Sequence, residues 1–466
     1  MLSAIRRRIP LSDSVLLRLA VFTGLLVGLV GIGFVTPRVS PEMVLMAVVA
    51  PPAVVLAISQ LEYGVLAIIW TAAFVRFSVG TGTDSRIVAS LMMAGLFLTL
   101  WLARMFTVDK KLSLKPSRTN VPLLAFILTM GISYVWGNAF RDPLVITWGT
   151  WPLVQLGGLG VMVLLPGAFL LTANTISEMR WLKILCWTMV LIGVLALVDY
   201  FLPIRFSFLN TGGLFSLWFV SLTYAQAAFN KRLSLWMRLV LLVLVGVWLY
   251  VYFVKRITWL SGWLPSLVAV AIITFFKSKR LALVLALLVV VYVVANWGYY
   301  RDTVLAGESD ESGRTRMAAW QFNWRVTGKH LLFGTGPAGY AAYYMSYFPS
   351  DAMATHSNYI DIISQTGVVG MFFCLWFFGA LTWTGYRVRR RLKGTGDFGE
   401  GLAHAALAGC VGCILAMGLG DWMFPFVYTQ TIAGFDYAVY SWVLLGAILA
   451  LDSIVLVGAS PEKRVS

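Results

Sequence analysis

Residues 281–297 read LALVLALLVVVYVVANW, an apolar run without a charged residue. A helix needs about 20 predominantly apolar residues to cross a bilayer, and runs of nearly this length recur along almost the whole chain. Of the 466 residues, 59% are hydrophobic and 12% are charged, whereas soluble domains carry roughly 25% charged residues. The sequence therefore predicts an all-α integral membrane protein that crosses the bilayer many times.

The apolar runs predict about fourteen transmembrane helices, with a range of 11–14. The basic start MLSAIRRR precedes a long apolar run without a small-residue cleavage site, which favours a retained first span over a signal peptide. The predicted spans lie near residues 15–36, 42–59, 63–79, 86–106, 120–138, 152–173, 180–202, 212–229, 237–254, 257–276, 280–298, 358–386, 401–420 and 435–458.

Most of the 36 lysines and arginines fall on one side of the membrane if the N-terminus is cytoplasmic. Cytoplasmic loops of membrane proteins carry such an excess, so both termini are predicted to be cytoplasmic. The net charge of +16 then reflects topology and implies no nucleic-acid partner. The main basic segments are 6–8, 104–118, 230–238, 277–280, 387–393 and 463–464.

Residues 299–357 form the one long polar segment, and this orientation places them outside the cytoplasm. The chain is thus divided into a helix bundle (1–298), an extracytoplasmic loop (299–357) and C-terminal spans (358–466). Within the loop, Gly334-x-Gly336-x-x-Gly339 has the spacing of a dinucleotide-binding fingerprint. Only the short run LLF precedes it, so the spacing instead indicates a tight turn ending a helix that begins near Arg316.

His356 is the histidine best placed for chemistry, because it lies where the loop re-enters the membrane. An imidazole there suits a general base near neutral pH. The alternative is a hydrogen-bonded histidine that caps the next span together with Asn358. If His356 is not the base, Asp361 or Asp351 would be next. His330 and His404 lie near helix ends, where capping or packing is expected.

Several arginines lie on the extracytoplasmic side, where the positive-inside rule disfavours them. Guanidinium groups bind phosphate oxygens in a bidentate way, which makes these arginines candidates for a diphosphate site. Snorkelling to lipid head groups is the alternative, favoured for Arg141. The sequence contains no Asp-x-Asp, so no metal site is expected. The arginines are Arg141, Arg205, Arg256, Arg314 and Arg316.

Aromatic residues accompany these arginines in the loop. Helical spacing puts Arg316, Trp320 and Asn323 on one face. The tyrosines that follow suit either a sugar ring beside a phosphate or an interfacial aromatic belt; they are Tyr340, Tyr343, Tyr344 and Tyr347. Cys410-x-x-Cys413 lies within an apolar span, where small packing residues are the better interpretation.

These residues, in this order, resemble the O-antigen ligase and polymerase superfamily of bacterial membrane glycosyltransferases. The resemblance covers roughly residues 200–385. It is carried by Arg316-x-x-x-Trp320, by LLFGTGPAGY with Gly334, Gly336 and Tyr340, and by THSNYIDIISQTGVVG with His356 and Asn358. Weaker matches are RFSFLNTGG, which begins at Arg205, and VKRITWLSGW, which contains Arg256.

The resemblance implies a bundle of the GT-C type in the bacterial cytoplasmic membrane. It implies inverting, metal-independent transfer of a glycan from undecaprenyl diphosphate to an extracytoplasmic hydroxyl, with no cofactor. Arg316 and His356 would be catalytic, while Arg205, Arg256 and Arg314 would bind the diphosphate. The acceptor would be a glycan, lipid or protein, which leaves ligase and polymerase both open. A multi-pass transporter and a noncatalytic assembly partner are the alternatives.

Overall fold

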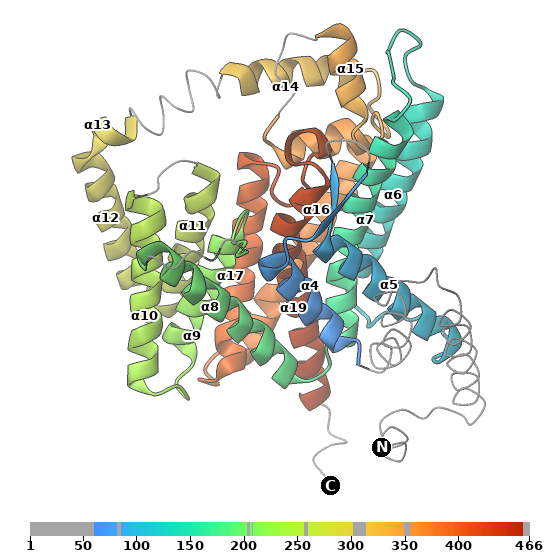
Figure 1. The fold of residues 1–466 in the computed structure, drawn as a ribbon. Coiled ribbons are helices and arrows are strands. Elements are labelled where there is room, and N and C mark those ends of the chain that lie inside the picture. Colours follow the sequence, from blue (N-terminus) through green and yellow to red (C-terminus); the bar gives the residue numbers. More distant parts are fainter. Residues whose placement is uncertain are drawn as a thin grey trace, which may run out of the picture.

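The apolar runs form helices that lie side by side in one bundle (Figure 1). The structure is a computed structural model that describes residues 60–81, 85–202, 206, 208–255, 260–301, 314–348 and 355–459. The predicted spans near 15–36 and 42–59 therefore lie outside the described residues.

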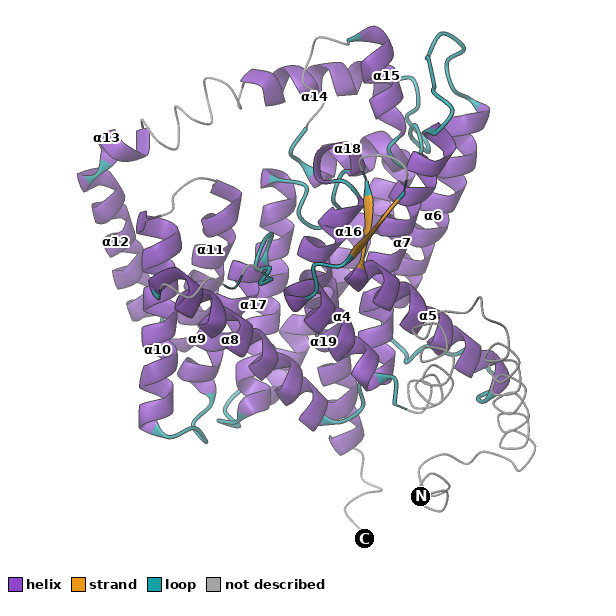
Figure 2. Ribbon diagram, viewed as in Figure 1, coloured by secondary structure: helices purple, strands orange, loops and turns teal. Residues whose placement is uncertain are grey.

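Helices dominate the described chain, and a single two-stranded hairpin is its only sheet (Figure 2). The elements are α4 (Glu62–Phe74), β1 (Ser78–Gly80), β2 (Arg86–Val88), α5 (Ala89–Thr107), α6 (Asn120–Ala139), α7 (Trp151–Thr175), α8 (Met179–Phe201), α9 (Phe215–Phe229), α10 (Leu235–Leu249), the π-helix η1 (Tyr250–Lys255), α11 (Leu260–Lys277), α12 (Lys279–Ala295), α13 (Trp297–Tyr300), α14 (Arg314–Thr327), α15 (Gly339–Tyr347), α16 (Asn358–Leu392), α17 (Phe398–Leu419), α18 (Val427–Gln430), the 3₁₀ turn η4 (Ile432–Gly434) and α19 (Phe435–Ala459).

Each predicted span that falls on described residues coincides with a helix, with boundaries within a few residues in most cases. Eight helices in the described chain are long and apolar enough to cross a membrane. The protein is therefore a multi-pass α-helical membrane protein. The number fourteen and the GT-C type of bundle stay predictions.

The predicted span at 63–79 is wrong at its C-terminal end. Helix α4 stops at Phe74, and the chain turns into the hairpin, in which Ser78 lies opposite Val88. With 13 residues, α4 is shorter than the roughly 20 residues that a span requires. The guanidinium of Arg76 follows α4 and donates to the carbonyl oxygen of Leu209 at 2.6 Å.

The core of the bundle is formed by α7 packed along α19 and by α17 packed against α9, α11 and α16. Small residues allow these helices to approach closely, as is common between membrane helices. A Cβ at Gly409 would lie 2.4 Å from the ring of Trp218, whose indole donates to Ser441 at 3.0 Å. Cys410 and Cys413 are buried free thiols in α17, which confirms their packing role.

The described basic segments (104–118, 230–238, 277–280 and 387–393) lie at one end of the bundle, and the described loop helices lie at the other (Figure 1). The Lys277 ammonium donates to the Ala228 carbonyl at 2.7 Å, and the Lys231 amide donates to the Gly396 carbonyl at 2.9 Å. Ala228 and Gly396 lie within three residues of the segments 230–238 and 387–393, so these contacts bring three of the predicted cytoplasmic segments together. Helix α14 lies across the opposite end, with α15 beside it.

Candidate functional site

The Gly334-x-Gly336 segment is a tight turn packed against α16. Both glycines have positive φ, 68° and 88°, a region that L-residues with side chains rarely adopt. A Cβ at Gly334 would lie 2.5 Å from the backbone of Gln365. The predicted turn is confirmed, although α14 itself already ends at Thr327.

This turn fills a break in α16. At Gly367 the backbone leaves the helical conformation, with φ 68° and ψ −170°, so nearby backbone groups need partners outside the helix. The amides of Thr335 and Gly336 donate to the carbonyls of Ser364 and Gln365 at 2.9 and 3.0 Å. In return, the Val368 amide donates to the carbonyl of Leu331 at 2.8 Å. The break thus fixes the glycine turn onto the start of α16.

Helix α14 is attached across the same region by Trp320 and Asn323. The Trp320 indole donates to the Thr355 carbonyl at 2.7 Å, next to His356 in sequence. The fully buried Asn323 accepts a hydrogen bond from the Ser364 hydroxyl at 2.6 Å. Two of the three residues on the predicted face of α14 therefore support the entrance to α16.

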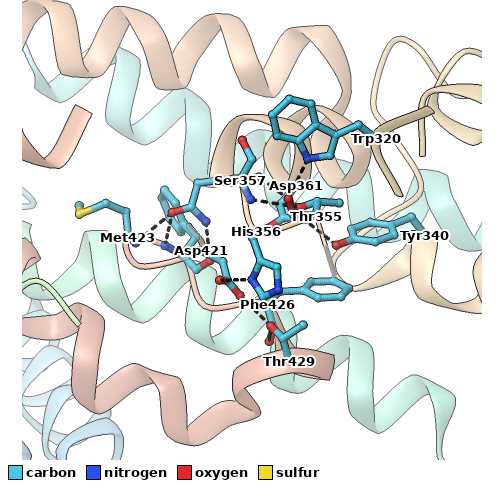
Figure 3. Close-up of polar contacts among 12 residues, drawn as sticks. Trp320, Tyr340, Thr355, His356, Ser357, Asp361, Asp421, Met423, Phe426 and Thr429 are labelled. Atoms are coloured by element: carbon cyan, nitrogen blue, oxygen red, sulfur yellow. Dashed lines mark hydrogen bonds and ion pairs between the residues drawn. The ribbon is translucent and has the colours of Figure 1, made fainter. Parts of the chain in front are cut away.

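Tyr340 and Asp361 form a buried polar pair beneath this entrance (Figure 3). The Tyr340 hydroxyl and the Thr355 hydroxyl both donate to Oδ1 of Asp361, at 2.7 and 2.5 Å. Phe426 stacks on the Tyr340 ring with centroids 4.5 Å apart. Burial, together with the Asp361 carboxylate, raises the pKa of Tyr340 well above its usual value. Tyr340 thus holds Asp361 in place and offers no open ring face to a sugar.

His356 lies beside this cluster, with the Asp421 carboxylate facing its imidazole (Figure 3). Its side chain is 39% exposed, while that of Asp421 is 4% exposed, and Nδ1 lies 3.7 Å from Oδ1 of the carboxylate. The other carboxylate oxygen accepts a hydrogen bond from Thr429 at 2.6 Å. His356 has a positive φ of 47°, an uncommon conformation for a residue with a side chain. The backbone there turns just before α16 begins.

Asp421 is held as an anion behind the imidazole. Burial raises the pKa of its carboxyl, but His356 and the Thr429 hydroxyl outweigh burial, so the net pKa lies below the usual value. Asp421 therefore keeps its negative charge throughout the neutral pH range. A carboxylate facing Nδ1 favours the imidazole tautomer with its proton on Nδ1, which leaves Nε2 free to accept a proton.

Asn358 joins the start of α16 to the segment that carries Asp421. Its amide nitrogen donates to the Phe424 carbonyl at 2.7 Å, and its oxygen accepts from the Met423 and Phe424 amides at 2.9 and 3.2 Å. Because Asn358 and His356 are two residues apart, this anchoring sets the distance between His356 and Asp421.

The other two histidines have structural surroundings, as predicted. The His404 ring stacks on Phe229 with centroids 3.6 Å apart, at the basic end of the bundle. His330 is buried, and its Nε2 lies 2.8 Å from the Tyr343 hydroxyl. Burial lowers the pKa of His330, an effect that Asp142 opposes and Lys329 reinforces.

The four arginines assigned to the diphosphate divide into two groups. Arg314 and Arg316 lie in the first turn of α14, the helix that Trp320 ties to Thr355. Arg205 and Arg256 lie outside the described residues, as does Asp351. Asp361, the other reserve base, is 2% exposed and so is poorly accessible to a substrate.

The residue that sequence reasoning missed is Asp421. It follows α17 directly, in GLGDWMF (418–424), 65 positions after His356. The available signal was an aspartate in the short loop between two apolar spans, on the same predicted side as His356. In the described chain, no group of three or more His, Cys, Asp or Glu side chains could hold a metal ion.

Residues 239–375 match the sequence model of the family described as O-antigen ligase. The matched segment lies within the part of the chain that carries the predicted resemblance, and it includes α14, the glycine turn and His356. The resemblance to the O-antigen ligase and polymerase superfamily is therefore confirmed, which supports an O-antigen ligase-like membrane glycosyltransferase at the family level. No curated protein sequence matches the chain.

Proposed function

We propose that the protein transfers a glycan from undecaprenyl diphosphate to an acceptor hydroxyl on the extracytoplasmic side of the bacterial cytoplasmic membrane. The observation that carries this proposal is the half-exposed imidazole of His356, backed by the buried carboxylate of Asp421. The pair is linked through Thr355 and Trp320 to α14, whose first turn contains Arg314 and Arg316.

His356 acts as the general base in this proposal. Nε2 accepts the proton of the acceptor hydroxyl as its oxygen attacks the anomeric carbon of the donor. The bond from that carbon to the diphosphate oxygen breaks at the same time, and undecaprenyl diphosphate leaves. Attack opposite the leaving group inverts the anomeric centre. Asp421 stabilises the positive charge that develops on the imidazole, which makes it a positioning and electrostatic partner.

Arg314 and Arg316 neutralise the leaving diphosphate, and Arg205 and Arg256 add to this site. Preorganised positive charge at a developing anion is among the largest contributions to enzymatic rate enhancement. Arginine is suited to this because its planar fork binds two phosphate oxygens at once. The proposed reaction uses no metal or cofactor.

The proposal includes an assignment of which segments lie on each side of the membrane. Residues 299–357 form the extracytoplasmic loop between the bundle at 1–298 and the spans at 358–466, and both termini are cytoplasmic. The gathering of basic segments at the end opposite α14 supports this orientation. The acceptor is a glycan, lipid or protein hydroxyl, as for a ligase or a polymerase.

Transfer by the purified full-length protein from an undecaprenyl-diphosphate-linked glycan tests the proposal. Arg316→Lys keeps the charge but loses the bidentate fork, and a charge-assisted hydrogen bond contributes about 1.5–3 kcal/mol. We therefore expect turnover to fall about 10- to 100-fold. Arg141→Lys is the matched control, with an expected effect below about threefold. Equal, small effects at both positions would contradict a diphosphate site at α14.

A further inference from the structure

An apolar groove lies between α11, α16 and α17, away from the His356 site. It has a volume of about 660 Å³, within the roughly 300–1,000 Å³ typical of ligand sites. On α16 it extends from Gly379 to Tyr386, in the second half of the helix towards the basic end. The other lining side chains are Ile272, Phe276, Thr382, Trp383, Leu407 and Val411.

A buried arginine packs against two of the side chains that line this groove. Arg389 is 8% exposed, and its guanidinium carbon lies 3.9 Å from the ring centroid of Phe276 and 5.5 Å from that of Tyr386. Both rings also line the groove. The Nε atom of Arg389 is buried and has no hydrogen-bond partner in the described part of the chain.

Two nearby arginines on α16 are paired with a carboxylate, and Arg389 is not. Arg387 and Arg391 form ion pairs with Asp452 at 3.4 and 2.7 Å. Arg389 takes part in none of the ion pairs formed by the described residues. The two aromatic rings and the Glu400 carboxylate, which attracts Arg389 from beyond ion-pair distance, offset only part of the cost of burying this cation. A bound anion in contact with the guanidinium would stabilise it further.

We propose that this groove binds an anionic phospholipid of the surrounding leaflet. One acyl chain occupies the apolar groove, and the head-group phosphate is held by Arg389. The exposed cations Arg390 and Lys277 surround the same end and favour a net negative head group. This site is independent of the proposed transferase reaction, because it lies at the opposite end of α16 from His356.

The two rings shared by the groove and Arg389 favour a lipid over a free phosphate ion. Phe276 and Tyr386 line the apolar groove and also pack against the Arg389 guanidinium. One ligand with an apolar chain next to a phosphate can therefore fill the groove and bind the guanidinium at the same time. A free anion would leave the apolar groove empty, and a zwitterionic lipid would gain less from the surrounding cations.

Two variants test the two halves of the site in the full-length protein. Arg389→Gln removes the charge at the phosphate position. Gly379→Leu fills the groove, and a Cβ at Gly379 meets no atom within 4 Å, so the folded helix accepts it. The matched controls are Lys393→Gln, an exposed cation at the same helix end, and Gly246→Leu, a similarly open glycine in α10.

The measurement is the melting temperature of delipidated protein titrated with phosphatidylglycerol, with phosphatidylcholine of equal chain length, and with inorganic phosphate. We expect phosphatidylglycerol to stabilise the wild type at concentrations at least about tenfold lower than phosphatidylcholine requires, and phosphate alone to have no effect. Arg389→Gln and Gly379→Leu should each need about tenfold more phosphatidylglycerol, while both controls match the wild type.

Three outcomes would overturn the proposal. These are equal responses to the two lipids, a full response to phosphate alone, or a wild-type response in the Gly379→Leu variant. The last of these decides the matter even where Arg389→Gln does not fold.

Discussion

Replacing Asp421 by asparagine removes one negative charge from behind His356 and changes little else. Asparagine has nearly the same shape as aspartate, and its carbonyl oxygen can still accept the Thr429 hydrogen bond that Asp421 accepts at 2.6 Å. The variant therefore isolates the electrostatic contribution of the carboxylate to catalysis.

The size of the effect follows from the geometry of the pair. Two unit charges about 4 Å apart interact with about 4 kcal/mol near a protein surface and about 1 kcal/mol in water. The separation here is 3.7 Å, and the imidazole is 39% exposed while the carboxylate is buried. An intermediate value of about 2 kcal/mol corresponds to roughly a 30-fold loss of turnover.

The assay is steady-state transfer by the purified protein with the donor varied. Because Asp421 does not contact the diphosphate in the proposed mechanism, kcat should fall and the donor KM should stay within about twofold. Asp142→Asn is the matched control, since Asp142 is hydrogen-bonded to Tyr347 at the same end of the molecule. A change below about threefold in kcat for Asp421→Asn, or a change confined to KM, would refute the assignment of Asp421.

Three further predictions concern stability and orientation. His330 has a pKa lowered mainly by burial, so the stability it supports is complete above the unfolded value of about 6.5 and is lost as pH falls. The hydrogen-exchange protection factors of α15, which correct for the slower intrinsic exchange at low pH, should therefore fall from pH 7.5 to 5, and less so in His330→Gln. Gly367→Ala should lower the free energy of unfolding by at least about 1–3 kcal/mol, measured by thermal unfolding, because the new Cβ would lie 2.2 Å from the Leu332 carbonyl oxygen. Gly131→Ala should leave the stability unchanged, because a Cβ there meets no atom within 4 Å. A cysteine replacing Ser309 should react with an impermeant maleimide in intact cells and one replacing Thr395 should not; the reverse pattern would contradict the orientation.

The helices were predictable because a bilayer span has a strong signal in the sequence, namely its length and its lack of charge. The prediction was wrong where an apolar run continues past the end of a helix or across a break in it. The apolar residues of 63–79 continue beyond the end of α4 at Phe74, so the sequence does not mark that end. Likewise, the apolar run that begins at Asn358 continues through the break at Gly367 without a change in composition. That break depends on backbone hydrogen bonds to the turn at Thr335, which is distant in sequence.

The site was predictable only where its parts are close in sequence. His356, Asn358 and the Trp320 face of α14 were predicted from local patterns and the family resemblance. The partnership of His356 with Asp421 was not, because two helices separate them and only the packing of α16 beside α17 brings them together. The same holds for Tyr340, whose spacing suggested a sugar platform but whose hydroxyl binds the buried Asp361.

The most direct test of the proposed chemistry is glycan transfer by the His356→Gln variant in a purified system. Glutamine keeps a hydrogen-bonding side chain next to Asp421 but cannot accept a proton at neutral pH, and a positioned base contributes about 10²–10⁴-fold. We predict a loss of turnover in this range with donor binding nearly unchanged, because the arginines hold the diphosphate. Transfer close to the wild-type rate would contradict the account and would leave His356 as a residue that only positions the start of α16.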